Sequence, residues 1–409
     1  MPMTCRHCAT PLTQRFVDLG FAPPSNAYLS VEALDRPEVT YPLRLMVCGT
    51  CFLVQTEDFA AADALFDADY AYFSSTSKSW LDHSARYAAE VTARYGLTAD
   101  SLVIEVASND GYLLRNFVAS GIPCLGIEPT AATAAAAEAQ GIPVWREFFG
   151  LTLGQRLTTE GRQADLIAGN NVYAHVPDIN DFTKGLAAAL KPQGVVTLEF
   201  PHLMRLVEFC QFDTVYHEHF SYLSLLTVSR IFAAAGLRIF DVEELPTHGG
   251  SLRVHGCLDA SAHVETPAVA TLLTEEHQRG MATLAYYEAF QPRADRVKDA
   301  FLRFLLDAKR DGKTVAAYGA AAKGNTLMNY AGVKPDLLPF VCDAAPSKQG
   351  KLMPGSHIPI LPPLALEAAR PDFVLILPWN IAAEVKRQLA GLAAQGTRFV
   401  TVVPEVLVE

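Results

Sequence analysis

The sequence predicts an α/β protein with a cysteine-rich N-terminal module followed by two α/β units. Strand-like apolar runs alternate with helical patterns between residues 101 and 200, and the same alternation restarts near Lys313. Two C-x-x-C pairs stand ahead of both units. The 409 residues also exceed what one compact core usually holds, which favours two or three domains.

The N-terminal segment contains the pairs Cys5–Cys8 and Cys48–Cys51. Each pair can present two thiolates to one tetrahedral ion, so we expect a structural zinc site with four cysteine ligands. A redox-active pair is the alternative, but two pairs in one short segment favour zinc. His7 is a weaker candidate ligand. The remaining cysteines stand in apolar runs and are expected to be small buried side chains.

The first α/β unit opens with the run SLVIEVAS, residues 101–108, which ends in the turn NDG before a helix. This arrangement places backbone N–H groups at a crevice beyond the carboxyl end of the strand. A second strand ends at Glu128, an acid that can accept hydrogen bonds from both hydroxyls of a ribose. The layout fits a dinucleotide or S-adenosylmethionine, and the absence of G-x-G-x-x-G counts against the dinucleotide. A plain structural turn is the third interpretation.

The later elements continue the alternation, which indicates a parallel sheet. Further strands of the first unit are expected at residues 143–149, 164–172 and 194–200, and a strand after a glycine turn at 248–258. One long helical stretch is expected over about 268–310. The second, smaller unit has strands expected at residues 313–319, 338–344, 373–379 and 399–403.

Composition excludes some classes of protein. A net charge of −11 argues against binding to nucleic acid or to an anionic membrane, because both need basic surface. The N-terminus has no apolar signal-peptide core, and no apolar run approaches the ~20 residues of a membrane span. We therefore expect a cytoplasmic protein with reduced thiols. The sequence leaves the oligomeric state open, and a monomer is compatible with it.

The stretch VYHEHFSY, residues 215–222, places two histidines and a glutamate among aromatic residues. It fits a half-buried aromatic segment, or an acid/base centre in which His217 or His219 is the base, because imidazole titrates near neutral pH. A metal site is a third interpretation, weakened because H-x-H has no obvious third ligand nearby. The two histidines would share a face if the stretch were a strand.

Taken together and in order, nine motifs resemble one family. They are the paired C-x-x-C motifs, EVASNDGYLL, GIEP, NNVYAHVPD, LEFPH, YHEHFSY, HGGSLRV and YGAAAKGNTLMNY. They are similar to the S-adenosylmethionine-dependent C-methyltransferases of deoxysugar biosynthesis, over nearly the whole chain. The resemblance implies an N-terminal zinc-binding module, a central Rossmann-like methyltransferase domain and a smaller C-terminal α/β domain that helps to bind the nucleotide sugar. We place these three parts at residues 1–66, 67–305 and 306–409.

The resemblance implies transfer of a methyl group from S-adenosylmethionine to C-3 of a nucleotide-linked 4-keto-deoxysugar, with dTDP as the expected carrier. A base removes the C-3 proton, and hydrogen-bond donors stabilise the enolate. The family pattern Tyr-x-Glu-His matches Tyr216, Glu218 and His219, and a second active-site histidine matches His175. We assign His219 as the base and Glu218 as its orienting partner. Tyr216 and His175 are expected to stabilise the enolate. Tyr216 as the base is the alternative.

The resemblance also assigns the binding residues. Those expected at the methyl donor are Glu105, Ala107, Asn109, Gly111, Tyr112, Glu128, Phe148, Phe149, Asn170 and Asn171. The family turn acid-x-Gly-x-Gly-x-Gly keeps one glycine here, because Ala107 and Asn109 replace the other two. Asparagine tolerates the left-handed backbone that such a turn can require.

Those expected at the nucleotide sugar are Tyr70, Tyr72, His248, Gly249, Arg253, Tyr318, Lys323 and Asn325. Lys323 beside a helix start suits a diphosphate. Plain structural turns are the alternative for both glycine-containing segments. A NAD(P)-dependent nucleotide-sugar oxidoreductase is the runner-up function, and a zinc-stabilised binding protein with a degenerate donor site is the third.

Overall fold

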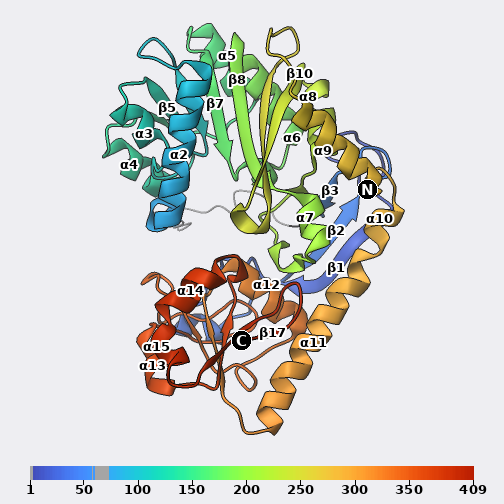
Figure 1. Ribbon diagram of the computed structural model, residues 1–409, viewed down its shortest axis with the longest axis vertical. Coiled ribbons are helices and arrows are strands. Elements are labelled where there is room, and N and C mark those ends of the chain that lie inside the picture. Colours follow the sequence, from blue (N-terminus) through green and yellow to red (C-terminus); the bar gives the residue numbers. More distant parts are fainter. Residues whose placement is uncertain (1–2, 58, 60–72) are drawn as a thin grey trace.

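The structure is a computed structural model, and it describes residues 3–57, 59 and 73–409. The predicted pocket residues Tyr70 and Tyr72 lie outside the described residues. The chain forms three sheets, one for each expected part, as Figure 1 shows. The α/β class is confirmed, whereas the boundaries at residues 66 and 305 stay a prediction.

The N-terminal sheet is antiparallel and has the strand order β1-β2-β3-β9. Three strands come from the module itself and the fourth from the central part of the chain: β1 (Gln14–Ala22), β2 (Tyr41–Val47), β3 (Val54–Thr56) and β9 (Ser221–Tyr222). Val54 pairs with Tyr222 and Gln55 with Ser221. A short helix η1 (Val31–Asp35) lies between β1 and β2. The sequence analysis assigned no secondary structure to this segment, so the sheet and the strand that it takes from the central part are findings of the structure.

The central sheet has the order β10-β11-β8-β7-β4-β5-β6. Its strands are β4 (Val103–Val106), β5 (Cys124–Ile127), β6 (Val144–Trp145), β7 (Ala164–Asn170), β8 (Leu190–Pro201), β10 (Leu237–Leu245) and β11 (Ser251–Leu258). Strands β4 to β8 are parallel, and β11 pairs antiparallel with β8 and β10, so the sheet is mixed rather than parallel throughout. The strand order reverses between β4 and β7, which opens a crevice beyond their carboxyl ends.

Helices cover both faces of the central sheet (Figure 1). They are α2 (Lys78–Tyr95), α3 (Leu114–Ala119), α4 (Ala131–Glu138), α5 (Leu151–Thr159), α6 (Ile179–Ala189), α7 (Leu203–Glu208) and α8 (Leu225–Ala234). Short helices η2 (Ser74–Thr76), η3 (Tyr173–His175), η4 (Phe212–Thr214) and η5 (Thr247–Gly249) lie in the loops. Helix α2 begins where the Ser77 side chain accepts the Trp80 N–H, and it ends at Gly96 in the left-handed conformation.

The expected strand at residues 143–149 is shorter than predicted. Only Val144 and Trp145 pair, at the edge of the sheet. The chain then turns outward, and the Arg146 guanidinium pairs with Glu138 on the surface at 2.6 Å. An edge strand needs fewer buried side chains than a central one, so the apolar residues beyond Trp145 do not have to continue the strand.

The C-terminal sheet has the order β14-β13-β12-β15-β16-β17. Its strands are β12 (Val315–Tyr318), β13 (Val341–Cys342), β14 (Ile360–Leu361), β15 (Phe373–Ile376), β16 (Arg398–Thr401) and β17 (Leu407–Val408). The helices are α12 (Ala322–Ala331), α13 (Leu364–Ala369), η6 (Trp379–Ile381), α14 (Ala382–Gln388) and α15 (Ala390–Ala393). The order reverses between β12 and β15, so this sheet has a second crevice of the same kind.

The helical stretch expected over residues 268–310 is divided into three helices. They are α9 (Pro267–Gln278), α10 (Ala285–Glu288) and α11 (Phe290–Arg310). Gly280, with φ of 89°, follows the first of them, because that backbone conformation does not continue a right-handed helix. Helix α11 runs from the N-terminal sheet to the C-terminal domain (Figure 1), and Phe290 at its start stacks on Phe16 with ring centroids 4.5 Å apart.

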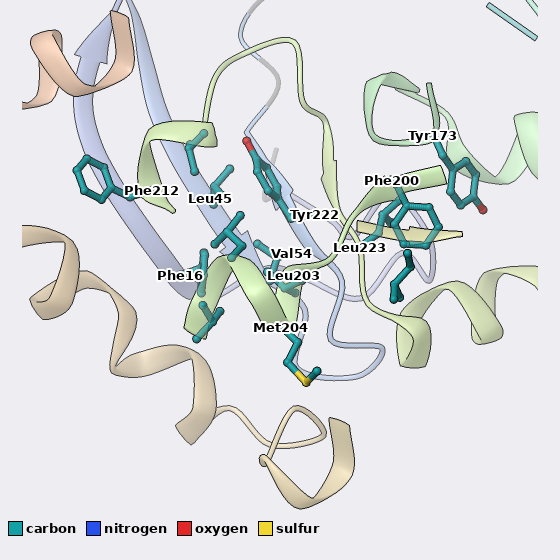
Figure 2. Packing of buried hydrophobic residues seen from close by; sticks show 14 of the residues in the cluster. Phe16, Leu45, Val54, Tyr173, Phe200, Leu203, Met204, Phe212, Tyr222 and Leu223 are labelled. Atoms are coloured by element: carbon teal, nitrogen blue, oxygen red, sulfur yellow. The ribbon is translucent and has the colours of Figure 1, made fainter. Parts of the chain in front are cut away.

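The core is continuous across the three parts. Figure 2 shows Phe16, Leu45 and Val54 of the N-terminal sheet among Tyr222 and Leu203 of the central part. All five side chains are buried.

None of the helices among residues 3–57, 59 and 73–409 combines the length and the apolarity needed to cross a bilayer.

Candidate active site

The turn after β4 keeps the backbone of a glycine-rich loop with only one of its three glycines. Ala107, Asn109 and Gly111 have φ of 57°, 49° and 79°. A non-glycine residue in this region is strained by about 1–2 kcal/mol. Such strain persists where the surrounding structure imposes it, most often at a functional site. The two replacements therefore preserve the shape of the turn.

Glu128 at the end of β5 supports this turn. Its Oε2 accepts the backbone N–H of Asn109 at 2.9 Å, and its Oε1 accepts that of Thr130 at 2.8 Å. The carboxylate is buried beside the crevice. Each oxygen has further lone pairs, so Glu128 can hold the turn and also accept from a ribose. Its contact with the donor stays a prediction.

Several polar groups around the crevice are buried without partners in the described part of the chain. They are both amide atoms of Asn170, the Ser108 hydroxyl and one oxygen of Asp110. Burial raises the pKa of Glu105 well above its usual range; Tyr112 opposes this rise, and the charges of Glu128 and Asp110 add to it. Buried polar groups normally have partners. This concentration of free donors and acceptors fits a polar, positively charged ligand such as S-adenosylmethionine.

Aromatic rings from α2 close one side of the crevice. Trp80 stacks on Tyr112 with centroids 6.0 Å apart and meets His248 edge-on at 5.6 Å. The Asn171 amide donates to His248 Nε2 at 3.2 Å, and both residues have positive φ, 55° and 54°. Burial and the charge of Lys323 lower the pKa of His248 to about 4, so its ring is a neutral acceptor. Asn171, expected to bind the methyl donor, is thus in contact with His248, expected to bind the nucleotide sugar.

The two phenylalanines expected near the adenine lie differently. Phe148 is 65% exposed, whereas Phe149 packs edge-on against Phe182 at 5.3 Å. Phe149 therefore belongs to the apolar layer between α5 and α6, and Phe148 is the one with a free face. Their contact with the donor stays a prediction.

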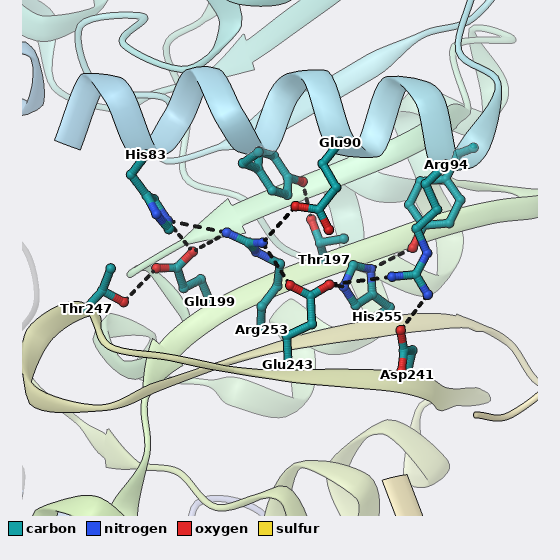
Figure 3. Close-up of polar contacts among 12 residues, drawn as sticks. His83, Glu90, Arg94, Thr197, Glu199, Asp241, Glu243, Thr247, Arg253 and His255 are labelled. Carbon is teal, nitrogen blue, oxygen red and sulfur yellow. Dashed lines mark hydrogen bonds and ion pairs between the residues drawn. The ribbon is translucent and has the colours of Figure 1, made fainter. Parts of the chain in front are cut away.

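Arg253 lies inside a buried network on the central sheet, which Figure 3 shows. Its guanidinium donates to Glu199 and Glu243, each at 3.1 Å, and lies over the Tyr87 ring. Glu199 also bonds His83 at 2.9 Å and accepts from the Thr247 hydroxyl at 3.0 Å. Burial alone would raise the pKa of Glu199, but His83 and Arg253 lower it. Arg253 thus fixes the carboxylate that anchors the start of η5, and its predicted contact with substrate stays a prediction.

His219 is buried with one ring nitrogen committed. Nδ1 donates to the Thr214 carbonyl at 3.0 Å, and Nε2 has no hydrogen-bond partner among the described residues. The rings of His175 and Tyr216 lie with centroids 4.6 Å and 4.0 Å from the His219 ring. Burial, followed by the neighbouring His175, holds the pKa of His219 well below its usual value. The ring is therefore neutral, with its lone pair on Nε2.

Glu218 and His219 diverge, although they are adjacent in sequence. Both Glu218 oxygens accept from the Asn26 amide at 2.9 Å, and no hydrogen bond joins Glu218 to His219 among the described residues. Burial raises the pKa of Glu218 to about 7, and Asn26 opposes the rise. Burial lowers the pKa of His175 to about 4, opposed by the backbone carbonyl of Glu218. Glu218 thus meets His175 through its backbone.

His217 points away from this group. Its Nε2 bonds the Pro42 carbonyl at 3.2 Å, and its ring meets Tyr41 edge-on at 5.9 Å. The stretch from Val215 to Phe220 is an irregular turn, neither strand nor helix, so the two histidines do not share a face. Of the two, His219 is the one beside His175 and Tyr216.

The second crevice, beyond β12 and β15, carries a cation. Lys323 Nζ donates to Asn380 at 3.0 Å and lies 4.3 Å from the Trp379 ring centroid. The Trp379 indole donates to Asp213 at 2.6 Å, which links this crevice to η4. Burial lowers the pKa of Lys323 to about 8, with Asp213 opposing the fall. Burial raises the pKa of Asp213 to about 6 against the effects of Lys323 and Trp379.

The other expected substrate residues lie around this second crevice. A Cβ on Gly249 would stand 2.4 Å from the Trp379 ring, so the glycine permits close approach of η5 to η6. Asn325 is buried and donates to the Ser25 carbonyl at 2.5 Å. Tyr318 packs in the C-terminal core and donates to Gln388 at 3.2 Å. Lys323 and Gly249 are therefore brought together, whereas Tyr318 and Asn325 bind neighbouring parts of the protein.

The four N-terminal cysteines converge. The Sγ atoms of Cys5, Cys8, Cys48 and Cys51 all lie within 4.8 Å of one another. Gln55 donates to Cys5 Sγ at 3.3 Å, and the Thr50 N–H donates to Cys48 Sγ at 3.4 Å. Four converging sulfurs with N–H donors around them fit a tetrahedral zinc ion with no open position. His7 is instead 2.8 Å from Asn180 through Nδ1.

Comparison with known proteins assigns the whole chain. Residues 5–66 match a zinc binding domain, residues 80–242 a methyltransferase domain, and residues 246–404 the C-methyltransferase C-terminal domain. The C-methyltransferase NovU of Streptomyces niveus is 35% identical over 401 residues, which cover 98% of this chain and 95% of that protein. The chain belongs to the C-methyltransferase family.

Two solved structures are similar to less than half of this chain. An S-adenosylmethionine-dependent methyltransferase from Clostridium acetobutylicum is 12% identical, with a TM-score of 0.35, over 44% of this chain and 92% of that chain. Magnesium protoporphyrin IX methyltransferase from Synechocystis with bound S-adenosylmethionine is 14% identical, with a TM-score of 0.33, over 43% and 78%. At such TM-scores we base no conclusion on either.

This C-methyltransferase uses S-adenosylmethionine, and its N-terminal module binds zinc, as the sequence predicted. Membership of this family rules out the two other functions that the sequence left open, a NAD(P)-dependent oxidoreductase and a binding protein. The sequence analysis missed Asn26, Trp80, His83, Asp213 and Trp379, which contact the expected site residues. The available signal was weak, because each is a single polar or aromatic residue in a segment with another evident role.

Proposed function

We propose that this enzyme methylates C-3 of a nucleotide-linked 4-keto-deoxysugar, with dTDP as the carrier and His219 as the base. The donor supplies an electrophilic methyl group bound to a sulfonium. What the protein must add is a base for the C-3 proton, donors for the enolate oxygen and a cation for the diphosphate. The described residues offer one candidate for each of these tasks.

The observation that carries the proposal is the orientation of the His219 ring. Because Nδ1 donates to the Thr214 carbonyl, the proton of the neutral ring is on Nδ1 and the lone pair is on Nε2. Its low pKa keeps the ring unprotonated at neutral pH. The same burial weakens it as a base, so we expect the neighbouring groups to stabilise the charge that forms when it takes the proton.

Tyr216 and His175 flank the His219 ring on the centroid distances given above. Tyr216 can donate a hydrogen bond to the enolate oxygen. Neutral His175 has one N–H, which faces the Glu218 carbonyl, so we assign His175 the task of holding the His219 ring in place. Lys323 offers its ammonium to the diphosphate from the second crevice. In this proposal His219 Nε2 takes the proton from C-3. The resulting carbanion would form a bond to the methyl carbon as the methyl–sulfur bond breaks, with S-adenosylhomocysteine as the leaving group.

The test separates the base from its neighbours. The enzyme is incubated with S-adenosylhomocysteine and a panel of nucleotide-linked 4-keto-deoxysugars in D₂O, and deuterium at C-3 is followed by NMR. Wild type should exchange, Tyr216→Phe should exchange slowly, and His219→Asn should not. A general base is typically worth about 10²–10⁴-fold, so methyl transfer by His219→Asn should fall by that factor. Exchange by His219→Asn at the wild-type rate would refute the assignment.

A further inference from the structure

The loops that carry the proposed catalytic residues are held by the zinc-binding module. β9 begins two residues after His219 and pairs with β3, and the Thr56 N–H donates to the Phe220 carbonyl at 3.2 Å. Two side chains of the module reach further into the same loops. The catalytic turn is irregular, so its shape depends on such outside contacts rather than on its own hydrogen-bond ladder.

Arg6 ties the two histidine loops together. Its Nη1 donates to the Pro177 carbonyl at 2.6 Å, and its Nη2 to the Thr56 carbonyl at 3.3 Å. The guanidinium also lies 5.4 Å from the centroid of the Phe220 ring. Pro177 is two residues after His175, and Phe220 is one residue after His219. One side chain therefore restrains both histidines, which lie edge to face.

The zinc site fixes Arg6 in turn. Arg6 stands between Cys5 and Cys8, and its backbone N–H donates to Gln55 Oε1 at 2.9 Å. The amide of the same Gln55 donates to Cys5 Sγ. The backbone at Arg6 is thus held by the metal ligands on both sides and by Gln55. Bound zinc would therefore fix the position from which the Arg6 side chain reaches its partners.

Asn26 makes a separate contact from the same module. Its amide donates to both oxygens of Glu218, which is 2% exposed. A single amide nitrogen that reaches both oxygens holds the carboxylate in one orientation. With the carboxylate held in this way, the backbone carbonyl of Glu218 faces the His175 ring.

We propose that Arg6 and Asn26 are positioning residues for methyl transfer, which makes the zinc-binding module a working part of the catalytic centre. This inference rests on the proposed roles of His175, Glu218 and His219. Neither Arg6 nor Asn26 is assigned contact with the donor or the sugar. Both act on the residues that do the chemistry.

The chain offers a matched control in Arg230. Its Nη1 donates to the Thr50 carbonyl at 2.9 Å, and its guanidinium lies 5.5 Å from the Phe52 ring centroid. Arg230 thus joins the module to α8 with the same kinds of contact that Arg6 makes, and both arginines are half-buried. The Arg230 contacts end at the second cysteine pair, away from His175 and His219.

The experiment compares Arg6→Ala with Arg230→Ala in the zinc-loaded full-length enzyme. Zinc content, melting temperature, affinity for S-adenosylhomocysteine, and kcat and KM are measured for each. We expect similar shifts in melting temperature, one zinc per chain and wild-type donor affinity in both variants. Only Arg6→Ala should lose kcat, by about tenfold or more, because small displacements of catalytic groups have effects of that size.

Asn26→Ala keeps the test decisive if Arg6→Ala loses zinc or fails to fold, because Asn26 is remote in sequence from the cysteines. It should lose kcat by about tenfold with zinc content and donor affinity unchanged. Wild-type kcat in Asn26→Ala, or equal losses in Arg6→Ala and Arg230→Ala, would overturn the inference. Failure of the proposed function would be distinguishable, because His219→Asn would then retain activity.

Discussion

The crevices at β4/β7 and β12/β15 occupy the same topological position in two sheets, but they carry opposite charges. Around the first stand the carboxylates of Asp110 and Glu128, beside Glu105, whose pKa burial and these two carboxylates raise well above the usual range. At the second stands the ammonium of Lys323 over an indole ring. One fold element thus provides two sites of opposite preference.

The difference shows how a chain with net charge −11 can bind two ligands of opposite sign. A sulfonium donor suits the acidic crevice, and a diphosphate suits the cationic one. The candidate base, His219, is uncharged and belongs to neither. The proposed function therefore assigns ligand binding and proton removal to different residues, so variants should separate the two.

The largest expected effect concerns the glycine of the second crevice. Gly319 has φ of 89°, and a Cβ there would stand 2.4 Å from the Pro378 ring. Gly319→Ala should cost about 3 kcal/mol of unfolding free energy, the sum of left-handed strain and overpacking. Urea unfolding measures it. A loss below about 1 kcal/mol would mean that the second turn tolerates a side chain as readily as the first.

The next effect should appear in donor binding. Glu128→Ala removes the expected ribose acceptor and also frees the N–H groups of Asn109 and Thr130. S-adenosylmethionine affinity should fall by at least ~1.5 kcal/mol, as for a charge-assisted hydrogen bond. Calorimetry tests this, with Glu138→Ala as the control, because the carboxylate of that exposed glutamate pairs with the surface residue Arg146 and lies outside the turn. Equal affinities in the two variants would place the donor elsewhere.

The matching change in the second crevice is Lys323→Met. It should raise the KM for the nucleotide sugar about tenfold, the value of one moderate charge-assisted contact, without changing donor affinity. Lys313 near the other end of β12 pairs with Asp372 at the surface, so Lys313→Met is the control. A rise in donor Kd in Lys323→Met would contradict the separation of the two crevices.

The same lysine gives a pH dependence. Burial lowers the pKa of Lys323 to about 8 in the free enzyme. The group is charged below that pH and neutral above it, so the KM for an anionic substrate should rise as pH increases through about 8. Initial rates between pH 6.5 and 9.5 measure it, and Lys323→Met should abolish this dependence.

The smallest effect returns to the first turn. Ala107→Gly relieves left-handed strain of about 1–2 kcal/mol, and it costs about 0.5–1 kcal/mol through the greater freedom of the unfolded chain. The net gain in unfolding free energy should be about 0.5 kcal/mol. Urea unfolding checks it, and a net loss would show that the Ala107 methyl group makes favourable contacts.

The sequence predicted the local features better than the distant ones. Three features follow from short motifs with a fixed local geometry: the strand that carries Glu105, the turn with Ala107 and Asn109, and the four converging cysteines. The contact of Asn26 with Glu218 joins segments that have no periodic pattern. No local propensity encodes such a meeting, because tertiary packing alone brings the segments together.

The stretch VYHEHFSY shows the same limit. The sequence left its conformation open: His217 and His219 would share a face in a strand but not in a helix. The backbone is a turn that points the two side chains in different directions. The Thr214 carbonyl and the module's β3 strand decide its shape, and both act from outside the motif. The family pattern identified the residues, but their directions came only from the fold.

The strand borrowed by the N-terminal sheet has a consequence for synthesis of the chain. β3 is complete at Thr56, but its partner β9 ends at Tyr222. At about 5–20 residues per second, the nascent chain carries an open strand edge for roughly 10–30 s. Open edges pair with other chains. Ribosome-stalled chains that end before Ser221 should therefore be more sensitive to protease at the module than chains that extend well beyond Tyr222, so the first part of the protein to be made is among the last to be finished.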